Sequence, residues 1–174
     1  MDLLNCNFTS LDKKDFILLK GDAILKVENL RNRIKNSGML LQNVFCVYVY
    51  EFANDQFSYP KGDSSILYIG QTATMAKEIQ SRFVHINSDK TETDGNDGQS
   101  NITLSNFYHN NKEIKLTIFR VKNKKTMDKL EKSLHQSFVA LYGSLPIATG
   151  TTSGDYTPKS LKPFIPPCTI KCDC

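Results

Sequence analysis

The sequence contains no apolar run that approaches the roughly 20 residues needed to cross a bilayer. Its first residues, Met1 to Cys6, lack the basic flank and the apolar core of a secretory signal, although export routes that need no such signal stay open. No internal repeat is visible either. These absences argue against membrane-spanning and repeat architectures, and we expect a soluble protein that does not bind a membrane.

Cysteine is scarce outside one short segment, because three of the five cysteines fall in the last seven residues. The spacing of Cys168, Cys172 and Cys174 is not that of a common zinc knuckle, and no histidine lies near them in sequence. We therefore expect a frayed terminus with free thiols rather than a metal site or a redox tail. Free thiols suit a reducing compartment, so the prediction is a cytoplasmic protein.

At 174 residues the chain is long enough for one compact domain with a proper core and short for two. Hydrophobic residues make up 40% of it, with ten Phe and seven Tyr, which argues against a disordered chain. We predict a central domain at 44–149, an N-terminal helical extension at 1–43 and an irregular C-terminal tail at 150–174.

Charge is distributed unevenly along the chain. From Lys112 to Lys132 there are eight basic and three acidic residues, a local net charge of +5 that exceeds the +4 of the whole chain. Residues 88–98 instead hold four acidic residues and one lysine, in a polar stretch that reads as a loop. A concentrated basic segment suits a surface that faces a phosphate backbone, although such a run is most often only a solvated face.

Three segments read as strands of one small sheet. Residues 44–52 are almost continuously β-branched or aromatic, which indicates a buried strand, and residues 65–72 combine β-favouring residues with a glycine turn. About eleven polar residues join them, so the simplest arrangement is an antiparallel pair with Tyr48 and Tyr68 in adjacent strands. Residues 113–121 alternate polar and apolar side chains, as expected of a third strand at the sheet edge.

Helical periodicity appears in three places. Apolar residues recur at helical spacing from Asp22 to about Gly38 and again over residues 75–86, where Arg82 and His85 share the other face. Arg82 has an ordinary alternative, an ion pair with Glu78 four residues earlier, and His85 could be a plain helix-end histidine. Residues 104–109 suggest one further short helix.

The strongest helix pattern starts at Thr126, the expected N-cap, and stops at Gly143. Glu131 and His135, four residues apart, flank its apolar stripe, and we expect neither to be needed for packing. The expected buried stripe consists of Met127, Leu130, Leu134, Phe138 and Leu141.

From about residue 44 to 149 the chain resembles the GIY-YIG nuclease superfamily, because five elements follow one another in that family's order. Cys46-Val47-Tyr48 stands where the family has Gly-Ile-Tyr, and Tyr68-Ile69-Gly70-Gln71-Thr72 is similar to its second motif. Arg82-Phe83-Val84-His85 resembles its helix motif, and Leu130-Glu131-Lys132-Ser133-Leu134 its glutamate helix. The resemblance implies an α+β fold in which helices flank a small three-stranded antiparallel sheet.

The resemblance also implies metal-dependent cleavage of phosphodiester bonds in DNA, by a restriction-type enzyme or another defence or mobile-element nuclease. Glu131 would hold one Mg²⁺ or Mn²⁺. Tyr48 would be the general base, and Tyr68 would position water or phosphate. Arg82 would stabilise the pentacovalent phosphate, and His85 would transfer a proton or contact phosphate. The residues expected to contact nucleic acid are Gln71, Thr72, Lys122, Lys124, Lys125 and Lys132.

Two positions depart from the family pattern. Cys46 replaces the first glycine, and the asparagine that commonly follows the glutamate helix is missing, since no Asn occurs after Asn123. Thr149 or Thr151 would have to take over its role. Tyr50, two residues from Tyr48 on the same strand face, is an alternative base.

Other readings stay open beside the endonuclease. His135 is either in the outer shell of the metal or a plain groove-edge residue. The chain could also be a nucleic-acid-binding module that kept the fold and lost turnover, or an antibacterial nuclease toxin domain.

Overall fold

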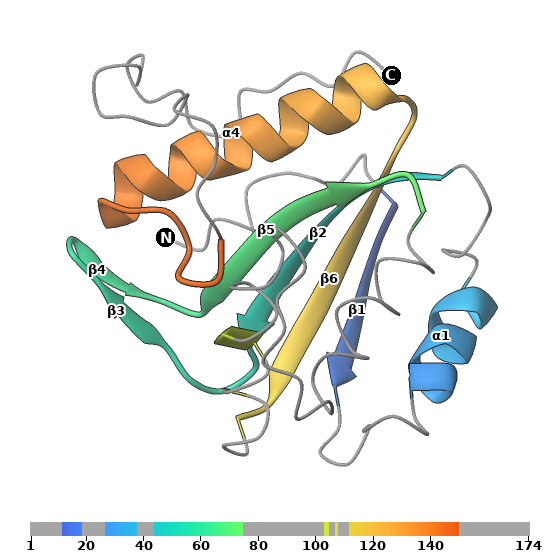
Figure 1. The fold of residues 1–174 in the computed structure, drawn as a ribbon, viewed down its shortest axis with the longest axis horizontal. Coiled ribbons are helices and arrows are strands. Elements are labelled where there is room, and N and C mark those ends of the chain that lie inside the picture. The colour runs from blue at the N-terminus through green and yellow to red at the C-terminus, as the bar shows by residue number, and fades with distance from the viewer. Residues whose placement is uncertain are drawn as a thin grey trace, which may run out of the picture.

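A computed structural model of the chain describes residues 12–18, 27–37, 44–74, 103–104, 107 and 112–149. Its main sheet has four antiparallel strands in the spatial order β1-β6-β2-β5, and a second sheet pairs β3 with β4 (Figure 1). The strands are β1 (Asp12–Leu18), β2 (Phe45–Phe52), β3 (Phe57–Tyr59), β4 (Gly62–Ser64), β5 (Ile66–Thr72) and β6 (Ile114–Val121). The helices are α1 (Val27–Asn36) and α4 (Lys124–Tyr142).

The α+β class and the antiparallel sheet agree with the prediction, but the sheet has four strands rather than three. The fourth strand, β1, comes from the segment expected to be a helical extension, and it pairs with β6 from Asp12↔Arg120 to Leu18↔Ile114. As a result, β6 is an interior strand and not the expected edge. The sequence did not indicate this strand because β1 begins Asp-Lys-Lys-Asp, which lacks the β-branched and aromatic residues typical of strands. Charged residues are nevertheless common in strands at sheet edges.

The connection between β2 and β5 is a small hairpin and not a plain loop. Strands β3 and β4 are joined by a turn at Pro60 and Lys61, and Gly62, the first residue of β4, has a φ of 148° in a region that other residues rarely adopt. Lys61 N–H donates to the Tyr142 carbonyl oxygen at 3.1 Å, and the Tyr59 and Phe138 ring centroids lie 5.0 Å apart. The hairpin is therefore packed against the C-terminal part of α4.

Two apolar clusters cover opposite faces of the main sheet. One joins Tyr48 and Tyr50 of β2 to Ile34 of α1, and the other joins Val47 and Val49 to the apolar stripe of α4. Successive strand residues point to opposite faces, so the alternation along β2 assigns each helix to its own side of the sheet. α4 lies along β5 and β2 (Figure 1).

The expected stripe of α4 is confirmed, and its N-terminal cap is corrected. Met127, Leu130, Leu134 and Phe138 are buried, and Leu141 is partly buried against the same cluster. The cap is Asn123 and not Thr126, because the Asn123 side-chain oxygen accepts a hydrogen bond from the Thr126 N–H at 2.9 Å. Gly143 ends the helix in the left-handed conformation, with φ of 80°, as predicted.

Several predicted segments lie outside the described residues. They are the start of the first helix before Val27, the helix at 75–86 with Arg82 and His85, the loop at 88–101 and the tail at 150–174. Residues 103, 104 and 107 are helical, and the last two belong to the short helix predicted at 104–109. Among the described helices, none is both long enough and apolar enough to cross a membrane.

Candidate functional site

The two tyrosines predicted to form the site are packed together. β2 and β5 pair antiparallel, with Tyr48 opposite Gly70 and Tyr50 opposite Tyr68. The rings of Tyr48 and Tyr68 stack with centroids 5.8 Å apart and an interplanar angle of 28°. The Tyr50 ring lies at 5.8 Å from that of Tyr48 and 6.3 Å from that of Tyr68. The prediction that the two tyrosines lie in adjacent strands is confirmed.

Gly70 makes room for this packing. A Cβ atom at residue 70 would lie 2.5 Å from Cε1 of Tyr68, 2.8 Å from the Tyr48 hydroxyl oxygen and 2.9 Å from Tyr48 Cζ. These separations are shorter than any carbon-to-heavy-atom contact a folded protein tolerates, and both rings would have to move. The prediction of a turn at Gly70 is wrong, because Gly70 lies within β5; the glycine is instead a packing requirement of Tyr48 and Tyr68.

The two tyrosines differ in exposure. Tyr48 is 1% exposed, as is the alternative base Tyr50, whereas Tyr68 is only partly buried. A general base has to reach the proton it removes, either directly or through one water. Of these three phenols, only Tyr68 is exposed enough for direct contact with a substrate. Tyr48 packs against the Tyr68 ring and so supports it.

Glu131 lies on α4, half-buried on the side of the helix next to the apolar stripe. Burial, together with the smaller effect of the nearby charge of Asp128, raises the pKa of its carboxyl group to about 7. Among the described residues, no positively charged side chain compensates the Glu131 carboxylate. A bound cation would supply that charge.

Asp128 is the member of this cluster that the sequence reasoning missed. Its Oδ2 atom lies 2.9 Å from Nζ of Lys124, whereas its Oδ1 atom is buried and has no hydrogen-bond partner among the described residues. Asp128 and Glu131 are three apart on a helix, a spacing that places side chains on one face. This three-residue spacing is visible in the sequence and is the signal that points to Asp128.

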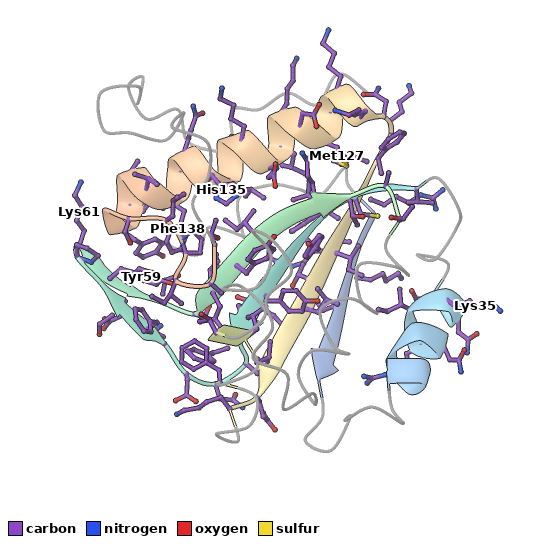
Figure 2. All side chains as sticks on the ribbon, in the orientation of Figure 1. Lys35, Tyr59, Lys61, Met127, His135 and Phe138 are labelled. Atoms are coloured by element: carbon purple, nitrogen blue, oxygen red, sulfur yellow. The ribbon has the colours of Figure 1, made fainter. Side chains whose placement is uncertain are left out.

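His135 corrects an expectation. We predicted that it would flank the stripe without contributing to packing, but it is 2% exposed. Burial lowers its pKa to about 4, and a hydrogen bond to the backbone of Ile69 acts in the opposite direction. His135 therefore lies buried between α4 and β5, mainly in its neutral form at pH 7 (Figure 2).

The sheet lies between the tyrosines and α4. Tyr48, Tyr50 and Tyr68 belong to the cluster on one face, and the α4 stripe packs on the other. Because β5 is the edge strand of the described sheet, a substrate could reach both Tyr68 and Glu131 only around that edge. The remaining predicted catalytic residues, Arg82 and His85, lie outside the described residues.

The predicted nucleic-acid contacts fall into two groups. Gln71 and Thr72 are at the end of β5, Gln71 partly buried and Thr72 buried, and Thr72 Oγ1 accepts a hydrogen bond from the Thr74 N–H at 3.0 Å. That bond orders the exit from β5, so the Thr72 hydroxyl has a local structural role. The lysines are exposed at the start of α4 and along it, and comprise Lys122, Lys124, Lys125 and Lys132.

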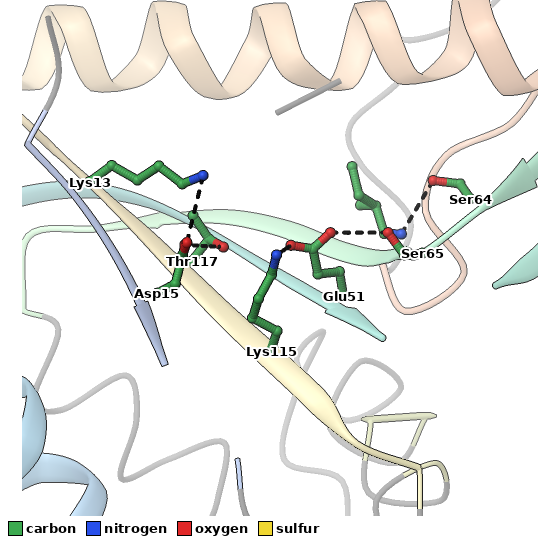
Figure 3. Close-up of polar contacts among 8 residues, drawn as sticks. Lys13, Asp15, Glu51, Ser64, Ser65, Lys115 and Thr117 are labelled. Carbon is green, nitrogen blue, oxygen red and sulfur yellow. Dashed lines mark hydrogen bonds and ion pairs between the residues drawn. The ribbon is translucent and has the colours of Figure 1, made fainter. Parts of the chain in front are cut away.

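A second polar cluster lies on the α4 side of the sheet (Figure 3). Glu51 Oε1 lies 2.6 Å from Nζ of Lys115, and its Oε2 accepts a hydrogen bond from Ser65 at 3.0 Å. The Thr117 hydroxyl donates to Asp15 Oδ1 at 2.8 Å, which links β6 to β1. The charged groups of this cluster are paired with one another, so we interpret it as a structural link between neighbouring strands and not as a ligand site.

Comparisons with known proteins do not assign the chain to a family. No protein-family model matches it, and no curated protein or solved structure matches it significantly. Within the described part of the chain, no group of three or more His, Cys, Asp and Glu side chains is placed to hold a metal ion. The resemblance therefore rests on the sequence motifs alone.

Proposed function

We propose that this protein is a metal-dependent DNA endonuclease of the GIY-YIG type, with its reaction centre at the β5 edge of the sheet. The observation that carries the proposal is the stacked pair of Tyr48 and Tyr68 over Gly70. Tyr48 belongs to one motif, and Tyr68 and Gly70 belong to the other, about twenty residues later. The two rings can pack in this way only because residue 70 has no side chain. That dependence supports reading the two motifs as one functional unit.

The described acidic residues suit a lightly held magnesium or manganese ion. Mg²⁺ is usually bound through one or two carboxylates, with water and substrate phosphate completing its coordination. Glu131 and the buried Oδ1 of Asp128 would supply those oxygens. When bound, such an ion stabilises charge on the non-bridging and leaving oxygens of a phosphodiester and lowers the pKa of a bound water.

The different exposures of Tyr68 and Tyr48 suggest different roles in the reaction. Tyr68, partly exposed at the edge strand, would orient the attacking water or the scissile phosphate. Tyr48, 1% exposed, would hold the Tyr68 ring in place and so acts as a positioning residue. Arg82 would stabilise the charge on phosphate and His85 would transfer a proton, as the motif resemblance implies.

A second candidate is a nucleic-acid-binding module that does not cleave. The observation in its favour is that the sheet lies between the tyrosines and α4, so that no described contact joins Glu131 to either ring. The absence of an Asn after Asn123 points the same way. Both candidates share DNA as the partner and differ only in turnover.

Cleavage of supercoiled plasmid in Mg²⁺ or Mn²⁺ separates the two candidates. We expect the wild-type protein to nick or linearise the plasmid, and Glu131→Gln and Tyr68→Phe to lower the rate about 100-fold or more. The matched control is Glu113→Gln, which alters an exposed carboxylate bonded to Asn54 on another part of the surface. Thermal melting of every variant should stay near the wild-type value.

Two outcomes would overturn the endonuclease. If the wild-type protein retards the plasmid without cutting it in either metal, the binding module is the better description. If Glu131→Gln cuts as fast as Glu113→Gln, Glu131 holds no metal needed for the reaction. Toxicity on expression that a neighbouring gene relieves would identify the toxin variant of the same chemistry.

A further inference from the structure

Three lysines form a row on the outer face of α4. Lys125, Lys129 and Lys132 are all exposed, at spacings of four and three residues that place them on one side of a helix. Their side is opposite the stripe of Leu130 and Leu134 that packs on the sheet. Nitrogen-tipped side chains project from α4 away from the sheet in Figure 2. We call these three residues the lysine row.

No acidic side chain neutralises the lysine row within its helix. α4 contains two acidic residues, Asp128 and Glu131. Asp128 is paired with Lys124, and Glu131 is half-buried next to the stripe. The lysine row is therefore a positive surface about 10 Å long from Lys125 to Lys132 at the rise of an α-helix, with the partly exposed Asp128, paired with Lys124, beside it.

The basic residues are placed where they cost helix stability. Lys124 and Lys125 occupy the first turn of α4, which has no acidic residue. The N-terminus of a helix carries a partial positive charge, so cations there are unfavourable and anions favourable. The helix end and the lysines produce positive potentials that add, which suits a multivalent anion next to this surface.

The same face lacks the side chains that bind single strands. Proteins that bind single-stranded nucleic acid without sequence preference stack bases on exposed aromatic rings. Among the described residues, the exposed large hydrophobic side chain is Ile147, at 39%, which lies beyond the end of α4. A surface of lysines alone can contact phosphates but presents no ring for stacking.

We propose that the lysine row lies along the sugar-phosphate backbone of double-stranded DNA and contacts it without reading base sequence. The inference rests on the proposed function only for the identity of the partner. Lys132 follows Glu131 directly and so lies about 100° from it around the helix axis. A backbone held by the row would run beside Asp128, with Glu131 further around the helix towards the sheet, and target choice would depend on other parts of the protein.

Binding of labelled duplexes in EDTA tests the inference apart from cleavage. The probes are two unrelated duplexes of about 20 base pairs and the single strand of one of them, titrated between about 50 and 200 mM salt. The test variant is K129Q/K132Q and the matched control is K14Q/K35Q, which removes two exposed lysines from β1 and α1. Circular dichroism checks that both variants are folded.

We expect K129Q/K132Q to lower the slope of log K against log salt by about 2, because each phosphate contact on B-DNA contributes about 0.9. Both duplexes should weaken equally, the single strand should bind more weakly than the duplex, and K14Q/K35Q should keep the wild-type slope. Equal slopes in the two variants would place the contact elsewhere and overturn the inference. So would tighter binding of the single strand, or a loss confined to one duplex sequence.

These outcomes are independent of turnover. A protein that cleaves in Mg²⁺ while K129Q/K132Q keeps the wild-type slope would overturn the lysine row alone. A protein that never cleaves but loses slope in that variant would overturn the endonuclease and keep the lysine row. Absence of any binding by the wild-type protein would overturn both.

Discussion

The hydroxyl oxygen of Tyr48 lies 2.8 Å from the place where a side chain at residue 70 would put its Cβ atom. The two residues face each other across β2 and β5. Gly70 thus decides how closely Tyr48 can approach the edge strand, and through the stacked rings it also decides where Tyr68 lies. The consequence is open to direct test.

Gly70→Ala should lower the free energy of unfolding by about 1–3 kcal/mol, because the new methyl group overlaps both rings. Urea denaturation measures the loss. Tyr68→Leu removes the nearest contact, Cε1 at 2.5 Å, so the cost of Gly70→Ala should be smaller in that background. An alanine that leaves stability unchanged, or costs that simply add, would contradict the packing described above.

Glu131 and His135 should give stability opposite dependences on pH. The pKa of His135 falls from 6.5 to about 4 on folding, so its contribution is complete above pH 6.5 and is lost as pH falls to about 4. The pKa of Glu131 rises from 4.5 to about 7, so its contribution is complete below pH 4.5 and is lost as pH rises to about 7. The two contributions oppose each other, so the stability of the wild-type protein should rise with pH between 4.5 and 6.5, but less steeply than His135 alone would make it rise.

Single substitutions separate the two slopes. In Glu131→Gln the remaining histidine should make stability rise with pH, by up to about 3 kcal/mol. In His135→Gln the remaining carboxyl should make it fall, by about 1 kcal/mol once solvent screening is allowed for. The measurement is urea denaturation in EDTA across this range, and its readout is the slope, which a uniform loss of packing does not change. Parallel curves for the two variants would refute the assignment.

Tyr59 joins three parts of the chain through one hydroxyl group. Its oxygen donates a hydrogen bond to the Ile66 carbonyl at 2.7 Å and accepts one from the Ile147 N–H at 3.1 Å, and burial raises its pKa to about 12. Tyr59→Phe leaves both backbone groups without this partner, so we expect a loss of about 1–3 kcal/mol.

The matched control is Tyr142→Phe. Tyr142 packs in the same aromatic cluster, with ring centroids 6.0 Å from Tyr59, but it is only partly buried. Chemical denaturation should show a clearly smaller loss for the control. Equal losses would mean that the two backbone hydrogen bonds of the Tyr59 hydroxyl contribute no more than the Tyr142 hydroxyl does.

Much of the fold was predictable because its signals are local. The β-branched run of β2 and the helical spacing of α4 identified both elements, and Gly143 identified the end of the helix. The adjacency of Tyr48 and Tyr68 followed from the length of the connection between their strands. The N-cap was misjudged by three residues, because Asn123 and Thr126 both suit that role and only the observed hydrogen bond distinguishes them.

The candidate site was less predictable, because its properties depend on burial. The sequence pattern placed His135 at a groove edge, but contact with β5 buries it and lowers its pKa. The same pattern named Glu131 and passed over Asp128, whose interaction with Glu131 becomes evident from their shared burial on α4. Desolvation is a property of the packed chain and has no signature in a short motif.

The strand patterns of β2, β5 and β6, the apolar stripe of α4 and the basic character of that helix were determined by the sequence alone, because periodicity and charge act over a few neighbouring residues. The tertiary structure alone decided that β1 closes the sheet next to β6 and that α4 and the tyrosine pair lie on opposite faces. The physical reason is that strand pairing joins backbones more than a hundred residues apart, as in Asp15↔Thr117. Backbone hydrogen bonds of that kind are largely independent of side-chain identity.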